Sequence, residues 1–204
     1  MSENMRRRGG PKSLLLIAQG FPWTGKTLEE VAAQWRLAPR DAALRIIRQS
    51  IEKEKGRGTA VASFNMAQAD VDLLMRQPWI VTSSDGSDGH PRMFATFPEK
   101  YVRYVRDRPV IDLATFVRQS TGRTADIYKI DHRGYLRPGY YADVVVIDPA
   151  RYAPRADYMH PRELSVGVTR LFVNGALAVR DSQTTGATAG RGLLRPTPVQ
   201  CPPQ

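Results

Sequence analysis

Residues 59–104 alternate between the sequence patterns of β-strands and α-helices. Residues 59–64 and 80–84 are short apolar runs that predict buried strands, and residues 66–76 between them have the spacing of an amphipathic helix. A polar, glycine-containing loop and a further helix from about Phe97 follow. Strands that alternate with helices are typical of a parallel sheet covered by helices. The region therefore predicts an α/β fold.

The rest of the chain falls into parts of different character. Before residue 59, a buried strand at residues 13–18 and helices at 28–35 and 41–51 are predicted, with Pro39 interrupting between the helices. Two further helices are predicted at residues 112–119 and 122–129. All of these elements suit the helix-rich, α/β part of the chain.

The composition changes near residue 131, where turn residues and β-branched side chains become frequent. Residues 142–148, 168–173 and 176–179 predict strands. Asn174-Gly175 between the last two predicts a tight type I′ hairpin. We therefore divide the chain into an α/β part (residues 1–130), a small β part (131–192) and a flexible tail (193–204).

Charge and cysteine content restrict the possible partners and location. The net charge is +10, but the basic residues are scattered and not interleaved with aromatic ones, so no nucleic-acid partner is predicted. A single cysteine, Cys201, cannot form an internal disulfide and favours a reducing compartment. The apolar run at residues 14–18 is too short for a signal-peptide core or a membrane span. We expect a cytoplasmic protein without a membrane partner.

A phosphate-loop pattern near the N-terminus gives an alternative hypothesis. Residues 20–27, GFPWTGKT, satisfy GxxxxGK[ST] between a predicted strand and a predicted helix. Residues 144–148, VVVID, resemble the apolar strand that ends in a magnesium-binding acid. However, Pro22 lacks a backbone N–H and Trp23 is bulky, which disfavours a loop that wraps amides around phosphate. Nucleotide binding through Gly20 to Thr27 is therefore the alternative to the main hypothesis.

An acid, Asp85, follows the strand predicted at residues 80–84, and Gly86 comes directly after it. An α/β barrel carries its catalytic groups where strands open into loops, but Asp-Gly is also a common turn pair. Arg92 could bind a substrate carboxylate through two parallel hydrogen bonds, or it could pair with a nearby acid. His90 could contact substrate or act as a ligand, or it could order the loop. The candidate catalytic residue is Asp85, and His90 and Arg92 are candidate substrate-binding residues.

Short motifs surround this loop, and further short motifs lie downstream. They are Phe64-Asn65-Met66, Arg76-Gln77-Pro78-Trp79, Ser84-Asp85-Gly86, His90-Pro91-Arg92, Thr96-Phe97-Pro98, Arg133-Gly134, Pro138-Gly139 and Val173-Asn174-Gly175. Together they resemble the N-acyl-D-amino-acid deacylases (D-aminoacylases) of the amidohydrolase superfamily. Ala95 departs from the resemblance, which suggests glycine at that position.

The resemblance implies the C-terminal part of a (β/α)₈ TIM-like barrel, followed by part of a small β domain. It also implies zinc-dependent hydrolysis of N-acyl-D-amino acids. Asp85 would take a proton from the attacking water and deliver it to the leaving amine.

The zinc ligands that the resemblance implies are absent from this sequence. No His-X-His pair occurs, and His90, His132 and His160 are widely separated. A catalytic zinc needs about three protein ligands. We therefore expect no metal ligands in this chain, no activity of the chain alone, and completion by an upstream barrel half. A non-catalytic remnant that acts only by association is the third hypothesis.

Overall fold

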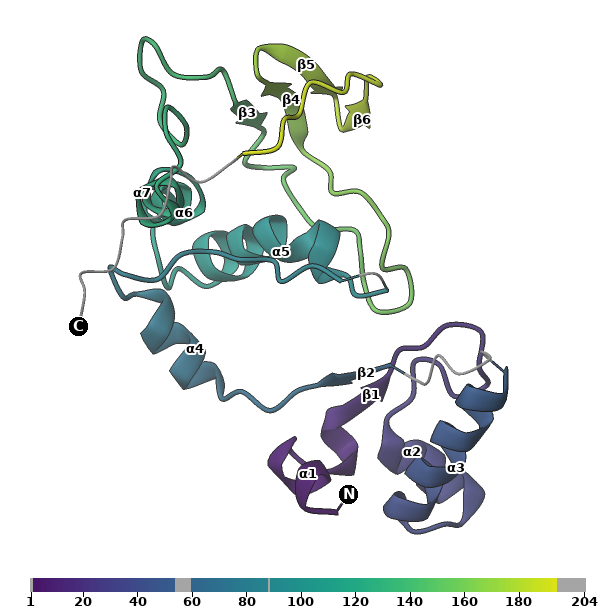
Figure 1. The fold of residues 1–204 in the computed structure, drawn as a ribbon. Helices are drawn as coiled ribbons and strands as arrows, with labels where there is room; N and C mark the ends of the chain where they lie inside the picture. Colours follow the sequence, from purple (N-terminus) through teal and green to yellow (C-terminus); the bar gives the residue numbers. More distant parts are fainter. Residues whose placement is uncertain (1, 54–59, 88, 194–204) are drawn as a thin grey trace, which may run out of the picture. The chain divides into compact units, whose positions relative to one another are not determined.

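The computed structural model describes residues 2–53, 60–87 and 89–193, which form two units (Figure 1). The first unit comprises Met1–Asp72, Gly86–Met93 and Ala156–Glu163. The second comprises Leu73–Asp85, Phe94–Arg155 and Leu164–Gln204. In this described part of the chain, no helix is both long and apolar enough to cross a membrane.

The first unit packs two helices against a short two-stranded sheet. Its elements are α1 (Ser2–Arg7), the 3₁₀-helix η1 (Pro11–Ser13), β1 (Leu14–Leu16), α2 (Leu28–Trp35), α3 (Pro39–Lys53) and β2 (Val61–Ser63). β1 and β2 are antiparallel, with Leu14 opposite Ser63. The core of this unit is formed by Leu14, Leu16, Phe21, Trp23, Leu28, Val31, Ala32, Ala42 and Ile46.

Helix α2 has a capping box at its start and a left-handed residue at its end. The Thr27 hydroxyl accepts a hydrogen bond from the Glu30 backbone N–H (3.2 Å), and the Glu30 carboxylate accepts one from the Thr27 N–H (2.6 Å). This reciprocal capping box satisfies two of the unpaired donors of the first turn. The helix ends at Arg36, whose φ of 53° is left-handed. The prediction of a helix at residues 28–35 is therefore confirmed.

The second unit combines helices with a four-stranded antiparallel sheet in the order β3-β4-β5-β6 (Figure 1). Helices α4 (Gln68–Met75) and α5 (Arg92–Tyr101) each begin with residues of the first unit and end with residues of the second. Its further elements are the π-helix η2 (Val102–Asp107), α6 (Leu113–Ser120), α7 (Gly122–Tyr128), β3 (Val144–Ile147), β4 (Val168–Val173), β5 (Ala176–Arg180) and β6 (Gln183–Thr184). Tyr101, Ile111, Phe116 and Tyr152 form its buried core cluster.

The turn between β4 and β5 has the predicted geometry. Asn174 and Gly175 have φ values of 49° and 83°, and two consecutive positive φ angles define a type I′ turn. Val173 pairs with Ala176 on either side of it. The hairpin prediction at Asn174-Gly175 is confirmed.

Two helices start earlier than predicted, and each of them contains a proline. α3 includes Pro39 at its first position, where a missing N–H has no consequence. α5 begins at Arg92, five residues before the predicted start, and contains Pro98. Since Pro98 cannot donate to the carbonyl four residues earlier, the Phe94 carbonyl is available, and it accepts a hydrogen bond from the Ser165 hydroxyl (2.7 Å).

The mixed α/β content is confirmed, but the predicted parallel sheet is wrong for the described residues. The predicted strand at residues 59–64 appears as β2, which pairs antiparallel with β1. Residues 80–84 form no strand. A strand persists only as a member of a hydrogen-bonded ladder, and within the described ranges no second strand lies beside this segment.

Candidate functional site

Asp85 lies at the exposed end of residues 80–85, the segment that precedes the loop to α5. Its φ is 44°, in the left-handed region, which aspartate tolerates better than most residues. Its backbone N–H donates to the Ser83 hydroxyl (3.4 Å). The turn therefore places a carboxylate at the surface, directly before Gly86.

A buried polar network anchors this segment three residues upstream. The Lys100 amine of α5 donates to the Thr82 hydroxyl (2.7 Å) and to the Gln119 side-chain oxygen (2.6 Å). The Thr82 N–H donates in turn to the Gln119 backbone carbonyl (3.2 Å). Lys100 and Gln119 are 6% and 1% exposed. The segment is thus tied to α5 and α6 by side chains as well as by backbone.

Nothing in the sequence pattern indicates that Lys100 is buried. Ala95, Pro98 and Tyr101 form the apolar stripe of α5, and the helical period places Lys100 away from that stripe. A lysine on that side of the helix is expected to be exposed to solvent. It is buried instead because the segment at residues 80–84 covers this second side of the helix.

Burial lowers the pKa of Lys100 from 10.5 to about 8. Its two hydrogen-bonding partners, Thr82 and Gln119, are neutral and do not offset the loss of water around the ammonium. The charged form is therefore destabilised in the folded chain.

We expect this pKa shift to make the stability of the chain rise with pH. Because the unfolded lysine binds its proton more tightly, the free energy of unfolding should increase from pH 8 toward 10.5. The gain at the upper limit is about 3 kcal/mol. Urea unfolding of wild type and Lys100→Met between pH 7 and 9.5 measures the difference, in which ordinary tyrosine and lysine titrations cancel. A difference that does not change with pH would contradict the shift.

His90 and Arg92 lie together in the first unit. The Arg92 N–H donates to His90 Nδ1 (3.1 Å), and the guanidinium donates to the Ser87 hydroxyl (3.4 Å). The His90 ring packs edge-on against Tyr158 at 5.2 Å. Both side chains thus make contacts that order the loop.

The structure brings two of the three predicted site residues together. Asp85 belongs to the second unit, whereas His90 and Arg92 belong to the first. The substrate-binding roles of His90 and Arg92 stay predictions.

The hydrogen-bond donors of the phosphate-loop segment, residues 20–27, make contacts within the first unit. Trp23 is 4% exposed and belongs to the core of the first unit. The N–H groups of Gly25 and Lys26 donate to the carbonyls of Leu16 (2.8 Å) and Trp23 (3.1 Å). The Lys26 amine donates to the Gln34 side chain (2.9 Å). A phosphate site needs these donors directed at the ligand, so the geometry does not support nucleotide binding.

The side chains that the structure describes do not fit a catalytic zinc site. Within residues 2–53, 60–87 and 89–193, no group of three or more His, Cys, Asp or Glu side chains could hold a metal ion. His90 and His160 belong to the first unit and His132 to the second, and Cys201 lies outside the described residues. Such a site needs about three protein ligands and an open position, which the described residues do not supply.

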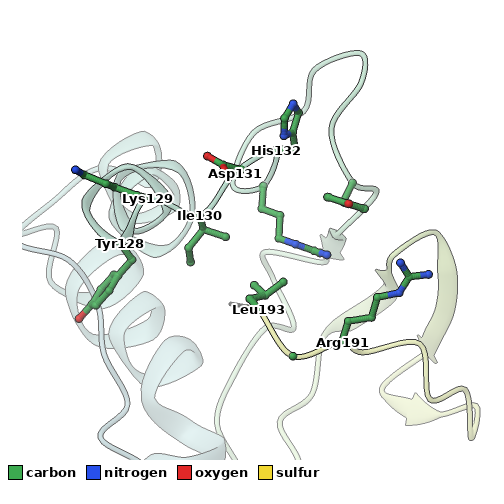
Figure 2. A pocket seen from close by; sticks show the side chains of 10 residues that line it. Tyr128, Lys129, Ile130, Asp131, His132, Arg191 and Leu193 are labelled. Carbon is green, nitrogen blue, oxygen red and sulfur yellow. The ribbon is translucent and has the colours of Figure 1, made fainter. Parts of the chain in front are cut away.

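A pocket of about 520 Å³ lies in the second unit, away from the predicted site residues. Its lining comprises Tyr128, Lys129, Ile130, Asp131, His132, Arg133, Tyr141, Arg191, Gly192 and Leu193. Figure 2 shows the Lys129 and His132 side chains directed away from the space between Ile130 and Leu193. These two side chains therefore do not converge on a ligand in that space.

Arg133, a half-buried cation in the lining of this pocket, has a structural role. Its guanidinium bonds to the Asp143 carboxylate and to the Asn174 side-chain oxygen (2.6 Å), and it lies 4.2 Å from the centre of the Tyr141 ring. These contacts hold the turn after α7 against the β4–β5 hairpin.

Comparison with known proteins gives a consistent set of relatives. The family model described as "Amidohydrolase family" matches residues 10–179. A D-aminoacylase of Alcaligenes xylosoxydans xylosoxydans is 32% identical over 189 residues, which are 90% of this chain and 37% of that protein.

Two solved structures extend the likeness to the fold. A D-aminoacylase with a binuclear metal centre superposes with a TM-score of 0.73 at 34% identity, covering 89% of this chain and 38% of that one. An N-acyl-D-glutamate deacylase of Bordetella bronchiseptica, in complex with zinc and a phosphonate mimic of the tetrahedral intermediate, gives a TM-score of 0.70 at 29% identity, covering 85% and 36%. The chain spans less than two fifths of the length of these relatives.

Proposed function

The chain belongs to the amidohydrolase family, and we propose that it forms the C-terminal part of a deacylase that hydrolyses the amide bond of N-acyl-D-amino acids. The observation that carries this proposal is the match to D-aminoacylases in both sequence and fold over nearly all of the chain. The motif Ser84-Asp85-Gly86 lies within the matched region. The competing phosphate-loop hypothesis has no support in the loop geometry.

We also propose which parts of the complete enzyme this chain supplies. Residues 1–130 would be the last part of a (β/α)₈ barrel, residues 131–192 a segment of the small β domain, and residues 193–204 a tail. Residues 80–84 would become a barrel strand once a neighbouring strand is present. The partner would be a polypeptide that supplies the upstream barrel half.

Exposed apolar side chains support docking of such a partner. In the second unit, Leu73, Leu74 and Trp79 are 59%, 46% and 66% exposed around the segment that leads to Asp85. Exposed apolar surface that is large and contiguous usually marks an interaction site. In the proposed complete enzyme, the upstream barrel half would pack against these side chains.

In the proposed mechanism, Asp85 transfers the proton. As a water oxygen bonds to the amide carbon, the Asp85 carboxylate takes the proton that the water loses. When the C–N bond breaks, the same carboxyl group gives this proton to the amine nitrogen. An amine is a poor leaving group without that proton, so one well-placed carboxylate assists both steps. Zinc is present in the Bordetella relative, but the described residues hold no site for it.

Arg92 is the proposed partner of the substrate carboxylate, with His90 beside it. A guanidinium matches a carboxylate through two parallel hydrogen bonds. The bond from the Arg92 N–H to His90 Nδ1 keeps the two residues adjacent. Both would then act in substrate binding rather than in proton transfer.

A chimeric enzyme tests the function. Residues 10–179 of this chain replace the matching segment of the Alcaligenes D-aminoacylase, and hydrolysis of N-acetyl-D-amino acids is measured with and without added zinc. We expect zinc-dependent activity from the chimera and none from the 204-residue chain alone. A folded chimera that binds zinc but does not hydrolyse these substrates would indicate the non-catalytic remnant. Hydrolysis by the isolated, zinc-loaded chain would show that no partner is needed.

A further inference from the structure

The buried amine of Lys100 lies at the junction of four parts of the second unit. Lys100 itself belongs to α5 and contacts Thr82 in the segment before Asp85. It also contacts Gln119 of α6, whose side-chain amide donates to the Met75 carbonyl at the end of α4 (3.0 Å). Lys100 and Gln119 together thus connect the segment to three helices.

We propose that Lys100 is a positioning residue that fixes the Asp85 segment against α5 and α6. Within the described residues, residues 80–84 have no strand beside them. The bonds of Thr82 to Lys100 and Gln119 therefore replace the ladder that would otherwise hold this backbone in place. The importance of Asp85 rests on the proposed function, whereas the anchoring of the segment does not.

The chemistry of the network suits an amine in particular. The atoms that face Lys100 Nζ are a hydroxyl oxygen and an amide oxygen, and both accept hydrogen bonds. A neutral amine still has two N–H donors, one for each oxygen, so the network survives loss of the proton. No carboxylate is needed beside it, and none is bonded to Lys100 in the described part of the chain.

A buried ammonium without a counter-ion lowers stability at neutral pH. A methionine of similar length would fill the same space without that penalty. Lysine at this position therefore weakens the folded state as a whole while it orders one segment. That opposition separates local positioning from a general structural role, because the two predict opposite effects of removing the amine.

Hydrogen exchange followed by mass spectrometry, with the wild-type 204-residue chain and its Lys100→Met variant compared, tests the proposal. Amides of residues 81–85 should exchange about tenfold faster than in wild type, the effect of losing about one hydrogen bond. The free energy of unfolding at pH 7 should be unchanged or higher. Arg103→Met is the matched control: Arg103 is an exposed cation one turn further along the chain, paired with Glu99, and its loss should leave this exchange unchanged.

A second variant keeps the test decisive. Thr82→Val removes the hydroxyl that accepts from Lys100 and should raise exchange at residues 81–85 by a similar factor. The double variant should exchange more slowly than the product of the two single effects predicts, because both changes remove the same Lys100–Thr82 bond. Additive effects, unchanged exchange in Lys100→Met, or uniformly faster exchange with lower stability would each overturn the proposal. The measurement involves no catalysis, so failure of the deacylase proposal would leave its result intact.

Discussion

Asp85→Asn is expected to lower kcat of the chimeric deacylase by about 10³-fold, within the range attributed to general acid–base catalysis. Asparagine has nearly the same size as aspartate and tolerates the left-handed φ of 44°, so the turn should persist. It cannot take a proton from water or deliver one to an amine. Steady-state rates on N-acetyl-D-amino acids measure the loss, and zinc analysis of the same samples should show unchanged metal content.

The matched control for this substitution is Glu99→Gln, which neutralises an exposed acid of α5 that pairs with Arg103. It should leave kcat within about twofold of the unmodified chimera, because surface ion pairs contribute little. Full activity of Asp85→Asn would make Asp85 a turn residue only. A loss of bound zinc together with activity would instead indicate that the carboxylate affects the metal rather than the proton.

Elements with strong local signals could be predicted from the sequence. The bounds of α2 follow from the capping box of Thr27 and Glu30, which lies within one turn of the chain. The hairpin at Asn174-Gly175 needs only two residues that accept positive φ. In both cases the determining interactions span a few residues, so no knowledge of the tertiary fold was required.

Elements that depend on distant partners could not be predicted. The pattern of residues 80–84 resembles a buried strand, but a strand also requires a neighbour to bond with. β2 pairs antiparallel with β1, about fifty residues earlier in the sequence, as the register of Leu14 with Ser63 shows. Sequence periodicity carries no information about which partner a strand will find.

The candidate site was predictable to a similar degree. Asp85 followed as a candidate from a local motif, an acid and a glycine after an apolar run, and its catalytic role stays a prediction. Lys100 did not follow from a local motif, because its burial depends on a segment eighteen residues away that covers the polar side of its helix.

Gly167→Ala is expected to destabilise the second unit by about 4 kcal/mol, at the severe end of single substitutions. Gly167 has a φ of +83°, and a Cβ built there would lie 2.4 Å from both the backbone N and the Cα of Tyr152. Neither side can easily move: the Gly167 carbonyl accepts from the Asp148 N–H (2.8 Å), and Tyr152 belongs to the buried core cluster. The left-handed conformation contributes about 1–2 kcal/mol of this loss and the backbone overlap contributes the rest.

Gly139→Ala separates these two contributions. Gly139 has the same φ of +83°, but a Cβ there would meet nothing within 4 Å. Its substitution should therefore lower the free energy of unfolding by only about 1–2 kcal/mol, the effect of the left-handed backbone alone. Urea unfolding followed by circular dichroism compares both variants with wild type. Equal losses would mean that residue 167 does not pack against the Tyr152 backbone, whereas a loss at least about twice as large for Gly167→Ala follows from that close approach.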